Sequence, residues 1–263
     1  MSKTLVIVLN HNLPELTNWL YYSLRKFQDD THDILIMDNG SEPQLVPKHA
    51  QIKLEQNVFW GGALNKAFEI VLKDKQYDSL MFLNNDIEIT PEIFVRSLRH
   101  ELFHNDFAIV SPCIAGKPMP WRQMQNWGSK TPRIVSWIDN TAPLFHRKII
   151  DAIRKFPDEL YIGWGQELIC YDVCLENSWR TAVCDYITIL HKGKQTLMQK
   201  KLAFHDLSTE CKAFHAGTSE NISWEEFKKV AATERDRYFE AHPLKYTMFT
   251  GFAEYGINYT YDG

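Results

Sequence analysis

The sequence lacks the features that mark a secreted or membrane-spanning protein. Its five cysteines are an odd, scattered set, unlike the dense even sets of small disulfide frameworks, so we expect reduced thiols and a cytoplasmic protein. The apolar run near the start ends at Asn10-His11-Asn12, which is too short for a signal peptide or a membrane span. No later run is longer, and any membrane contact is therefore expected to be peripheral, at the inner, cytosolic surface.

An excess of charge of one sign is also missing. The 29 Lys and Arg residues against 33 Asp and Glu residues give a net charge of −4, so no overall field favours non-specific nucleic-acid binding. A local pocket for a nucleotide diphosphate needs few charges and stays open as an alternative. What the chain does have is 263 residues that are 44% hydrophobic, enough to bury a full core.

Apolar runs of strand length alternate with helical patterns through the first half of the chain. This alternation predicts an α/β fold with a mostly parallel sheet flanked by helices. After residue 111, prolines, glycines and tryptophans predict loops with aromatic pockets, and regular structure returns at 133–138, 147–156, 166–176, 180–190 and 224–242. The predicted strands of the first half are 4–9, 33–37, 52–55, 79–83 and 107–111, and the predicted helices are 14–27, 62–72 and one that opens at Pro91.

Polar residues follow three of the predicted strands. They are Asn10-His11-Asn12, Asp38-Asn39-Gly40-Ser41 and Asn84-Asn85-Asp86. The carboxyl ends of parallel strands meet at one edge of a sheet, where such folds bind their ligands. Mg²⁺ or Mn²⁺ binds through one or two carboxylates while substrate phosphates supply the other ligands, so Asp86 is a candidate ligand. The alternative is an ordinary polar turn at the end of a strand.

Taken in order, these segments resemble the motifs of family-2 inverting glycosyltransferases with the GT-A (Rossmann-like) fold. The resemblance covers roughly residues 4 to 191 and rests on the order of the motifs more than on any one of them. The matching segments are Val6–Asn12, Asp38–Ser41, Asn57–Asn65, Phe82–Asp86, Phe156–Glu159 and Trp164–Glu167, followed by His191.

The resemblance implies a nucleotide-sugar donor, and each part of that donor would need different contacts from the protein. The Asp38 carboxylate would accept a hydrogen bond from the base or ribose. Backbone amides near a helix N-terminus at Gly61 and Gly62 would approach phosphate or ribose oxygens, although a tight turn uses the same residues. Uridine is the base that the resemblance favours, with guanosine and thymidine open. The residues expected to bind the nucleotide are Asn10, Asp38, Asn57, Gly61, Gly62, Asn65 and Asn85.

The resemblance also implies a metal and a catalytic base. Asp86 would hold Mn²⁺ or Mg²⁺ against the diphosphate, while Asn84 replaces the first carboxylate of the family's Asp-x-Asp motif. His191 would complete the metal site, or would only form a hydrogen bond. Glu167 would take the proton of the acceptor hydroxyl. It follows Gln166 where the family usually has Glu-Asp, and Asp158 or Glu159 is the second choice for the base; the alternative for Glu167 is a solvated first-turn residue.

Two other function classes stay open. His100-Glu101-Leu102-Phe103-His104 matches the His-Glu-x-x-His motif of zinc metallopeptidases, but the sequence offers no clear third ligand. A non-catalytic nucleotide-sugar or glycan binder of the same fold is the other alternative, favoured by amides at Asn84 and Gln166 where the family often has acids.

These observations predict a metal-dependent inverting glycosyltransferase that moves a sugar from a nucleotide-sugar donor to a hydroxyl of a glycan, lipid-linked or other acceptor. The expected domain organisation is a GT-A domain over 1–200, with a nucleotide-binding half at 1–111 and an acceptor or catalytic half at 112–200. A C-terminal helical and aromatic extension over 201–263 is expected to contain a helix entered through a capping box of Ser223 and Glu226.

Overall fold

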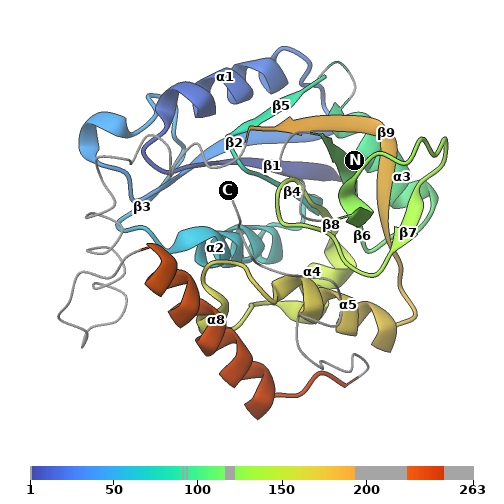
Figure 1. Ribbon diagram of the computed structural model, residues 1–263. Helices are drawn as coiled ribbons and strands as arrows, with labels where there is room; N and C mark the ends of the chain where they lie inside the picture. The colour runs from blue at the N-terminus through green and yellow to red at the C-terminus, as the bar shows by residue number, and fades with distance from the viewer. Residues whose placement is uncertain (1, 91, 93, 116–121, 193–223, 246–263) are drawn as a thin grey trace.

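A computed structural model describes residues 2–90, 92, 94–115, 122–192 and 224–245 of the chain (Figure 1). Its centre is a nine-stranded sheet in the order β3-β2-β1-β4-β8-β6-β9-β5, with β7 paired to β9. The strands are β1 (Lys3–Asn10), β2 (His32–Asn39), β3 (Ile52–Leu54), β4 (Tyr77–Leu83), β5 (Ile87–Ile89), β6 (Ile109–Ala115), β7 (Arg133–Val135), β8 (Leu144–His146) and β9 (Thr181–His191). The helices are α1 (Pro14–Arg25), α2 (Phe59–Lys73), α3 (Phe94–His104), α4 (Arg147–Ile153), α5 (Gln166–Glu176) and α8 (Trp224–Ala241), with short 3₁₀ turns η1 (Pro43–Leu45), η2 (Arg122–Met124) and η3 (Asp158–Leu160).

The predicted α/β fold with a mostly parallel sheet is confirmed. Strands β3, β2, β1 and β4 run parallel to one another, and β6 runs parallel to β9. Three short strands, β5, β7 and β8, run antiparallel to their neighbours. Strands β5 and β8 were not predicted, whereas β3 and β7, which are equally short, lie within predicted segments.

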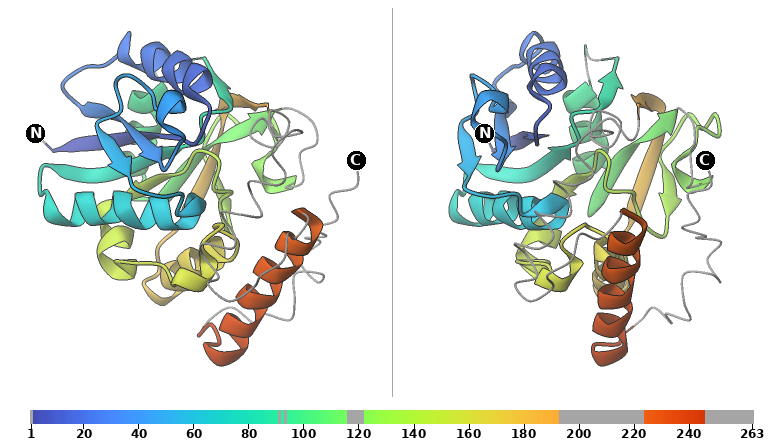
Figure 2. Two further views of the ribbon diagram at one scale, coloured as in Figure 1. Left: turned by 90° about the vertical axis from the view of Figure 1, so that its left-hand side faces the viewer. Right: turned by 60° about the vertical axis from the view of Figure 1, so that its left-hand side comes forward.

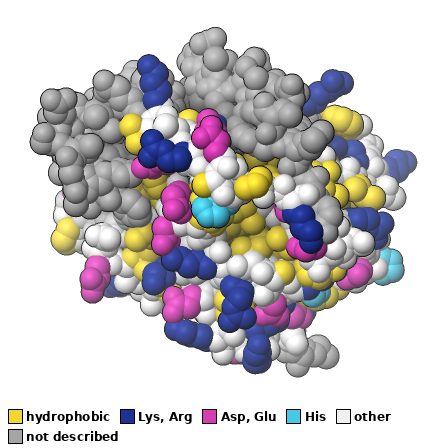
Figure 3. All heavy atoms as spheres, turned by 90° about the horizontal axis from the view of Figure 1, so that it is seen from below, with side chains coloured by type: hydrophobic (Ala, Val, Ile, Leu, Met, Phe, Trp, Pro, Cys, Tyr) yellow, Lys and Arg dark blue, Asp and Glu magenta, His cyan; other side chains and the backbone are white. Residues whose placement is uncertain are grey.

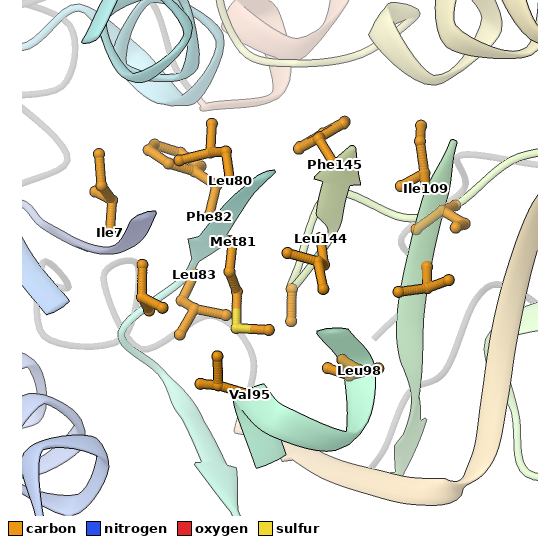
Figure 4. Close-up of a cluster of buried hydrophobic side chains, with 14 of the residues drawn as sticks. Ile7, Leu80, Met81, Phe82, Leu83, Val95, Leu98, Ile109, Leu144 and Phe145 are labelled. Carbon is orange, nitrogen blue, oxygen red and sulfur yellow. The ribbon is translucent and has the colours of Figure 1, made fainter. Parts of the chain in front are cut away.

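Helices cover both faces of the sheet. Helices α1 and α3 lie on one face, and α2 and α4 lie on the other (Figures 1 and 4). Figure 4 shows Leu80 and Phe82 of β4 pointing toward one face while Met81 and Leu83 point toward Val95 of α3. All four β4 side chains have 0% exposure, so this strand is buried on both sides, as expected for the centre of a doubly covered sheet.

Strand β6 corrects the expectation that loops begin after residue 111. The strand continues through Pro112 to Ala115 because its pairing with β9 shifts register between Pro112 and Cys113. A bulge of this kind accommodates a proline that cannot donate to the ladder. Asp185 lies in the bulged part of β9 and accepts hydrogen bonds from the Arg133 guanidinium and from backbone N–H groups of Trp127 and Ser129. Burial raises the pKa of Asp185, but these bonds outweigh burial and lower it overall.

The predicted C-terminal helix is present as α8, which lies along one side of the main layers (Figure 2). It packs on η3, and its Phe239 joins a small core with Trp137, Leu160 and Leu168. Gly165 has φ +95° and a Cβ there would lie 2.8 Å from the Phe239 ring, so this junction requires glycine. Ser223 of the predicted capping box, the side chain of Glu226, the domain boundary at 200/201 and the aromatic tail from Tyr246 lie outside the described residues.

The predicted division between residues 111 and 112 falls inside β6, and strands from both halves alternate in one sheet. The two predicted halves are therefore not separate layers, and their division of roles stays a prediction.

The described cysteines and charges agree with the composition. Four cysteines are free and buried, and Cys170 and Cys174 share helix α5; Cys211 lies outside the described residues. Figure 3 shows Lys and Arg side chains mixed with Asp and Glu on the face that it draws, without a large field of one sign. Among the helices described, none has the length and apolarity needed to cross a bilayer.

Candidate functional site

A buried chain of hydrogen bonds joins the ends of β1, β2 and β4. Asn85 Nδ2 donates to Thr17 Oγ1 at 2.9 Å, and the Thr17 hydroxyl donates to Asn10 Oδ1 at 2.7 Å. Asn10 Nδ2 in turn donates to Asp38 Oδ1 at 2.7 Å, and Asp38 Oδ2 accepts from the backbone N–H of Ser41. The structure therefore brings together Asn10, Asp38 and Asn85, three residues predicted to bind the nucleotide. Thr17 of α1 completes the chain, and no motif marked it in the sequence.

The loop before α2 is held by Asn39. Its Nδ2 donates to Asn57 Oδ1 at 2.9 Å, and its Oδ1 accepts from the N–H of Val58 at 3.0 Å. The Asn57 amide also lies 3.3 Å from Nε2 of His11, whose Nδ1 contacts the Asn39 carbonyl. Asn57 is thus fixed beside the end of β1, at the predicted nucleotide edge.

The two predicted glycines lie inside α2, because the helix begins at Phe59 and not at residue 62. The N–H of Gly61 donates to the carbonyl of Tyr161 at 2.6 Å, so this amide is used within the chain. A Cβ on Gly61 would lie 2.4 Å from the Leu160 carbonyl oxygen and 2.5 Å from Nε2 of Gln166. Gly61 therefore allows the close approach of α2 to the segment that leads into α5. Gly62 packs on Val58 within the same turn.

Asn65 lies further along α2 and is bonded at both ends of its amide. Its Nδ2 donates to the Phe156 carbonyl at 3.0 Å, and its Oδ1 accepts from the Phe156 N–H at 2.8 Å. This reciprocal pair ties α2 to the chain after α4. Asn65 therefore forms a structural link between two segments of the fold. Its predicted contact with the nucleotide stays a prediction.

Asp86 and His191 are brought together by strands far apart in the sequence. Strand β5 pairs with β9 so that Ile87 lies opposite His191, and His191 Nε2 lies 3.2 Å from Asp86 Oδ1. Burial lowers the pKa of His191, but the hydrogen bond and charge of Asp86, together with the charge of Asp139, raise it overall.

The donor set of this pair fits a divalent cation that the substrate helps to hold. A carboxylate oxygen and an imidazole nitrogen face each other, and both are ligands of Mn²⁺. Within the described part of the chain no group of three His, Cys, Asp or Glu side chains forms a metal cage. The protein would therefore supply two ligands, and a diphosphate would have to supply others.

Asn84 replaces the first acid of the family's Asp-x-Asp motif, and it accepts a hydrogen bond from an aromatic side chain. The indole N–H of Trp60 donates to Asn84 Oδ1 at 2.9 Å, and the Trp60 ring packs edge-on against Phe82 at 5.2 Å. The Asn84 oxygen thus fixes the orientation of Trp60 at the end of β4.

A cavity of about 210 Å³ opens beside these groups. Its aromatic lining consists of Trp60, Trp137 and Trp164. Its polar lining consists of Asn84, Asp139, Asn140, Thr141, Glu167 and His191. The predicted metal ligand His191 and the predicted base Glu167 therefore line the same cavity.

Glu167 lies in the first turn of α5 and is 8% exposed. Its Oε2 accepts a hydrogen bond from the N–H of Gly165 at 3.0 Å. Burial is the largest influence and raises the pKa of Glu167 to about 7, with the charge of Asp139 adding to the rise and that of Arg235 opposing it. A carboxylate with a pKa near neutrality is suited to take up a proton at physiological pH.

Gln166 does not line the cavity. It is 1% exposed, and its Nε2 donates to the Leu160 carbonyl at 3.2 Å. An amide at this position therefore supports the loop before α5 without removing an acid from the cavity. Asp158, one of the second choices for the base, has a side chain that is 72% exposed and pairs with Lys155.

The segment Trp137–Thr141 is the part of the site that sequence reasoning missed. It runs into β8 and contributes Trp137, Asp139, Asn140 and Thr141 to the cavity. Asn140 Nδ2 donates to the Gly163 carbonyl at 3.0 Å, which binds this segment to the loop before α5. The sequence Trp137-Ile138-Asp139-Asn140 matches no known motif. An acid and an amide that closely follow a tryptophan are the signal for a sugar site that this segment does contain.

The His-Glu-x-x-His motif lies on α3, where the imidazole rings of His100 and His104 stack at 5.1 Å. No third ligand joins them in the described ranges. The described residues therefore offer no support for a zinc metallopeptidase.

Comparisons with known proteins agree with this geometry. The family model described as "Glycosyl transferase family 2" matches residues 5–154. No curated protein matches the sequence significantly.

Three solved structures are similar in fold. TarS 1-349 from S. aureus, in complex with UDP-GlcNAc, is 13% identical, with a TM-score of 0.55 over 96% of this chain and 75% of that chain. The mannosyltransferase PcManGT from Pyrobaculum calidifontis, in complex with GDP-Man and Mn²⁺, is 14% identical, with a TM-score of 0.55 over 94% and 76%. GalNAc-T7, with UDP, GalNAc and Mn²⁺, is 10% identical, with a TM-score of 0.57 over 94% of this chain and 58% of that chain. At these identities the likeness establishes the GT-A (Rossmann-like) fold alone.

Proposed function

The chain belongs to glycosyl transferase family 2, and from this premise we propose that it transfers one sugar from a nucleotide-sugar donor to a hydroxyl acceptor with inversion at the anomeric carbon. The donor's nucleoside would lie along the edge formed by Asn10, Asp38 and Asn57. The structural relatives that contain UDP-GlcNAc, GDP-Man or UDP support a nucleotide ligand, and they leave both uridine and guanosine open.

Asp86 and His191 would hold a divalent cation against the diphosphate, since they present an oxygen and a nitrogen donor 3.2 Å apart. When bound, Mn²⁺ or Mg²⁺ would neutralise the negative charge that develops on the departing nucleoside diphosphate. The presence of Mn²⁺ in two of the related structures supports this assignment.

Glu167 would act as the general base. The acceptor oxygen forms a new bond to the anomeric carbon, the bond from that carbon to the phosphate oxygen breaks, and the acceptor proton passes to Glu167. An in-line attack of this kind inverts the configuration at the carbon. The sugar would lie in the cavity between His191 and Glu167.

The observation that carries the proposal is that Asn84, His191 and Glu167 line one cavity. They come from the end of β4, the end of β9 and the start of α5. A binder without catalytic activity has no need for a buried carboxylate with a raised pKa in the lining of such a cavity. The acceptor, and any peripheral contact with a membrane, are not specified by this geometry.

Donor hydrolysis tests the proposal. The protein, supplied with Mn²⁺ and a panel of UDP, GDP and dTDP sugars, is expected to release nucleoside diphosphate slowly from at least one of them. Glu167→Gln should abolish sugar transfer and leave the donor Kd nearly unchanged, because it removes the base and keeps the side-chain volume.

Glu176→Gln at the other end of α5 is the matched control and should keep wild-type activity. Equal loss of transfer and donor affinity in Glu167→Gln would remove Glu167 from the role of base.

A further inference from the structure

One of the acidic side chains in the cavity beside Glu167, that of Asp139, has no role in the proposed transfer reaction. Two of its lining side chains, Asp139 and Glu167, are acidic. None of the described residues that line it is a Lys or an Arg. Glu167 has the role of base and His191 lies in the same lining, so Asp139 is the acid that remains to be explained.

Two cationic side chains near the cavity, those of Arg235 and Lys192, pair with other acidic residues. Arg235 of α8 acts on Glu167 electrostatically, but it is 5% exposed and its guanidinium pairs with Asp236. Lys192 follows His191, and its Nζ lies 2.6 Å from Glu88 and over the ring of Trp19. Neither side chain lines the cavity, and the basic group among its described lining residues is the imidazole of His191.

Asp139 lines the cavity, and one of its carboxylate oxygens is bonded within its own turn. Its Oδ1 accepts from the N–H of Thr141 at 2.9 Å and from the Thr141 hydroxyl. No donor from the described residues reaches its Oδ2. An ionised carboxylate accepts hydrogen bonds and cannot donate them, so its partner must carry hydroxyl or amino groups. Thr141 is 4% exposed, and its two hydrogen bonds hold the Asp139 carboxylate in position.

The size and the rings of the cavity limit its occupant. About 210 Å³ is smaller than the roughly 300–1,000 Å³ of sites that enclose a whole drug-sized ligand, so the cavity suits one monosaccharide. The indoles of Trp60, Trp137 and Trp164 supply apolar surface for the C–H faces of a sugar ring.

Resting on the proposed function, we propose that Asp139 selects the transferred sugar, so that the enzyme takes hexosyl donors without an anionic substituent and rejects hexuronyl donors. A carboxylate on the sugar would lie in the same cavity as the Asp139 carboxylate, and like charges at short range repel each other. A neutral or amino sugar instead offers donors to the Asp139 Oδ2.

Matched donor pairs test this inference. Calorimetric titration in Mn²⁺ at one pH would compare UDP-glucose with UDP-glucuronic acid, UDP-GlcNAc with its uronic acid, and GDP-mannose with GDP-mannuronic acid. In the pair that binds most tightly, the wild-type protein should favour the hexose roughly tenfold or more. Asp139→Asn should reduce this preference, and Asp151→Asn, an exposed carboxylate on α4, should not.

The outcomes separate the two proposals. If a uronic acid donor binds the wild-type protein as tightly as its hexose partner, the selectivity inference is overturned and the transferase proposal stands. An unchanged preference in a folded Asp139→Asn protein would also overturn the role of Asp139. If no nucleotide sugar binds at all, the proposed function itself is wrong, and the inference that rests on it falls with it. Should Asp139→Asn not fold, Asp139→Ser takes its place in the same comparison.

Discussion

Glu167 combines near-complete burial with access to one cavity, and both features determine its protonation. Burial raises its pKa to about 7, and the backbone N–H of Gly165 limits the rise by donating to the charged form. A base of this kind is half ionised at neutral pH. The rate of transfer should therefore follow the fraction of Glu167 that is ionised.

We expect kcat/KM to rise with pH and to reach half of its plateau near pH 7, where the cited pKa of Glu167 lies. A pH profile of donor hydrolysis in Mn²⁺ measures this directly. A midpoint near 4.5, the ordinary value for a glutamate, would contradict a buried base. Glu176→Gln serves as the control, since an exposed carboxylate at the other end of α5 should leave the profile unchanged.

The same pKa predicts how stability depends on pH. The folded-state pKa of Glu167 lies above its ordinary value of 4.5, so the folded protein binds this proton more tightly than the unfolded chain does. The stabilisation is complete below about pH 4.5 and is lost as pH rises through about 7. A buried glutamine carries no charge and avoids this loss. At about pH 8, Glu167→Gln should thus unfold with a free energy about 3 kcal/mol greater than that of the wild type.

Urea denaturation of both proteins at about pH 5 and pH 8 tests this expectation. The advantage of Glu167→Gln should shrink at the lower pH, because the wild-type side chain is then largely neutral. An advantage that does not change with pH would mean that ionisation of Glu167 has no part in it.

Motifs in the sequence located some of these residues and missed others for a physical reason. Glu167, Asp86 and His191 stand in segments that resemble family motifs, and the structure places two of them 3.2 Å apart. Asp139 lies in a connecting segment whose position depends on the bond from Asn140 to the Gly163 carbonyl. Contacts of that kind join distant parts of the chain and leave no periodic pattern.

At the level of secondary structure, helix α2 and the segment leading into α5 are joined through one glycine. The chain around Leu160 and Tyr161 packs against Gly61 so closely that a Cβ would lie 2.4 Å from a carbonyl oxygen. Backbone on both sides prevents an easy adjustment. The position of Glu167 therefore depends on the absence of a side chain at residue 61.

Gly61→Ala is expected to destabilise the protein by about 3 kcal/mol, as overpacking at a rigid contact does. It should also reduce donor hydrolysis, because the segment that carries Glu167 must shift. Gly128→Ala is the control: residue 128 has φ +76°, but a Cβ there would meet nothing within 4 Å, so the change should cost only about 1 kcal/mol and keep activity. Thermal unfolding and donor hydrolysis, measured for both variants, test these two expectations. Full activity in Gly61→Ala would show that this contact does not position the base.

The long elements were predictable, and the short ones were predicted in part, since β3 lies within a predicted strand and β5 and β8 were missed. Helix α5 has the bounds Gln166–Glu176 that its pattern predicted, and β1, β2 and β4 differ from prediction by at most two residues at either end. Strands β5 and β8 have three residues each, and they form because β9 and β4 offer free edges. Pairing with a distant strand, and not local preference, determines where such strands occur.

The whole molecule brings together two sets of predicted site residues that come from different parts of the chain. The residues predicted to bind the nucleotide come from β1, β2 and the start of α2, whereas the proposed base comes from α5 and the histidine from the end of β9. The sheet order places β8, β6 and β9 beyond β4, and the antiparallel β5–β9 pair then brings His191 back to Asp86. The sequence predicted which residues collect at this edge, but not the short antiparallel strands that complete it.

The most direct test of the account is a crystal of the protein soaked with Mn²⁺ and a nucleoside diphosphate, with data collected at the manganese absorption edge. The account predicts one anomalous peak within coordination distance of Asp86 and His191, with the diphosphate on the same ion and the base of the nucleotide next to Asp38. A peak at His100 and His104 instead, or a nucleotide bound without metal and away from Asp86, would contradict it.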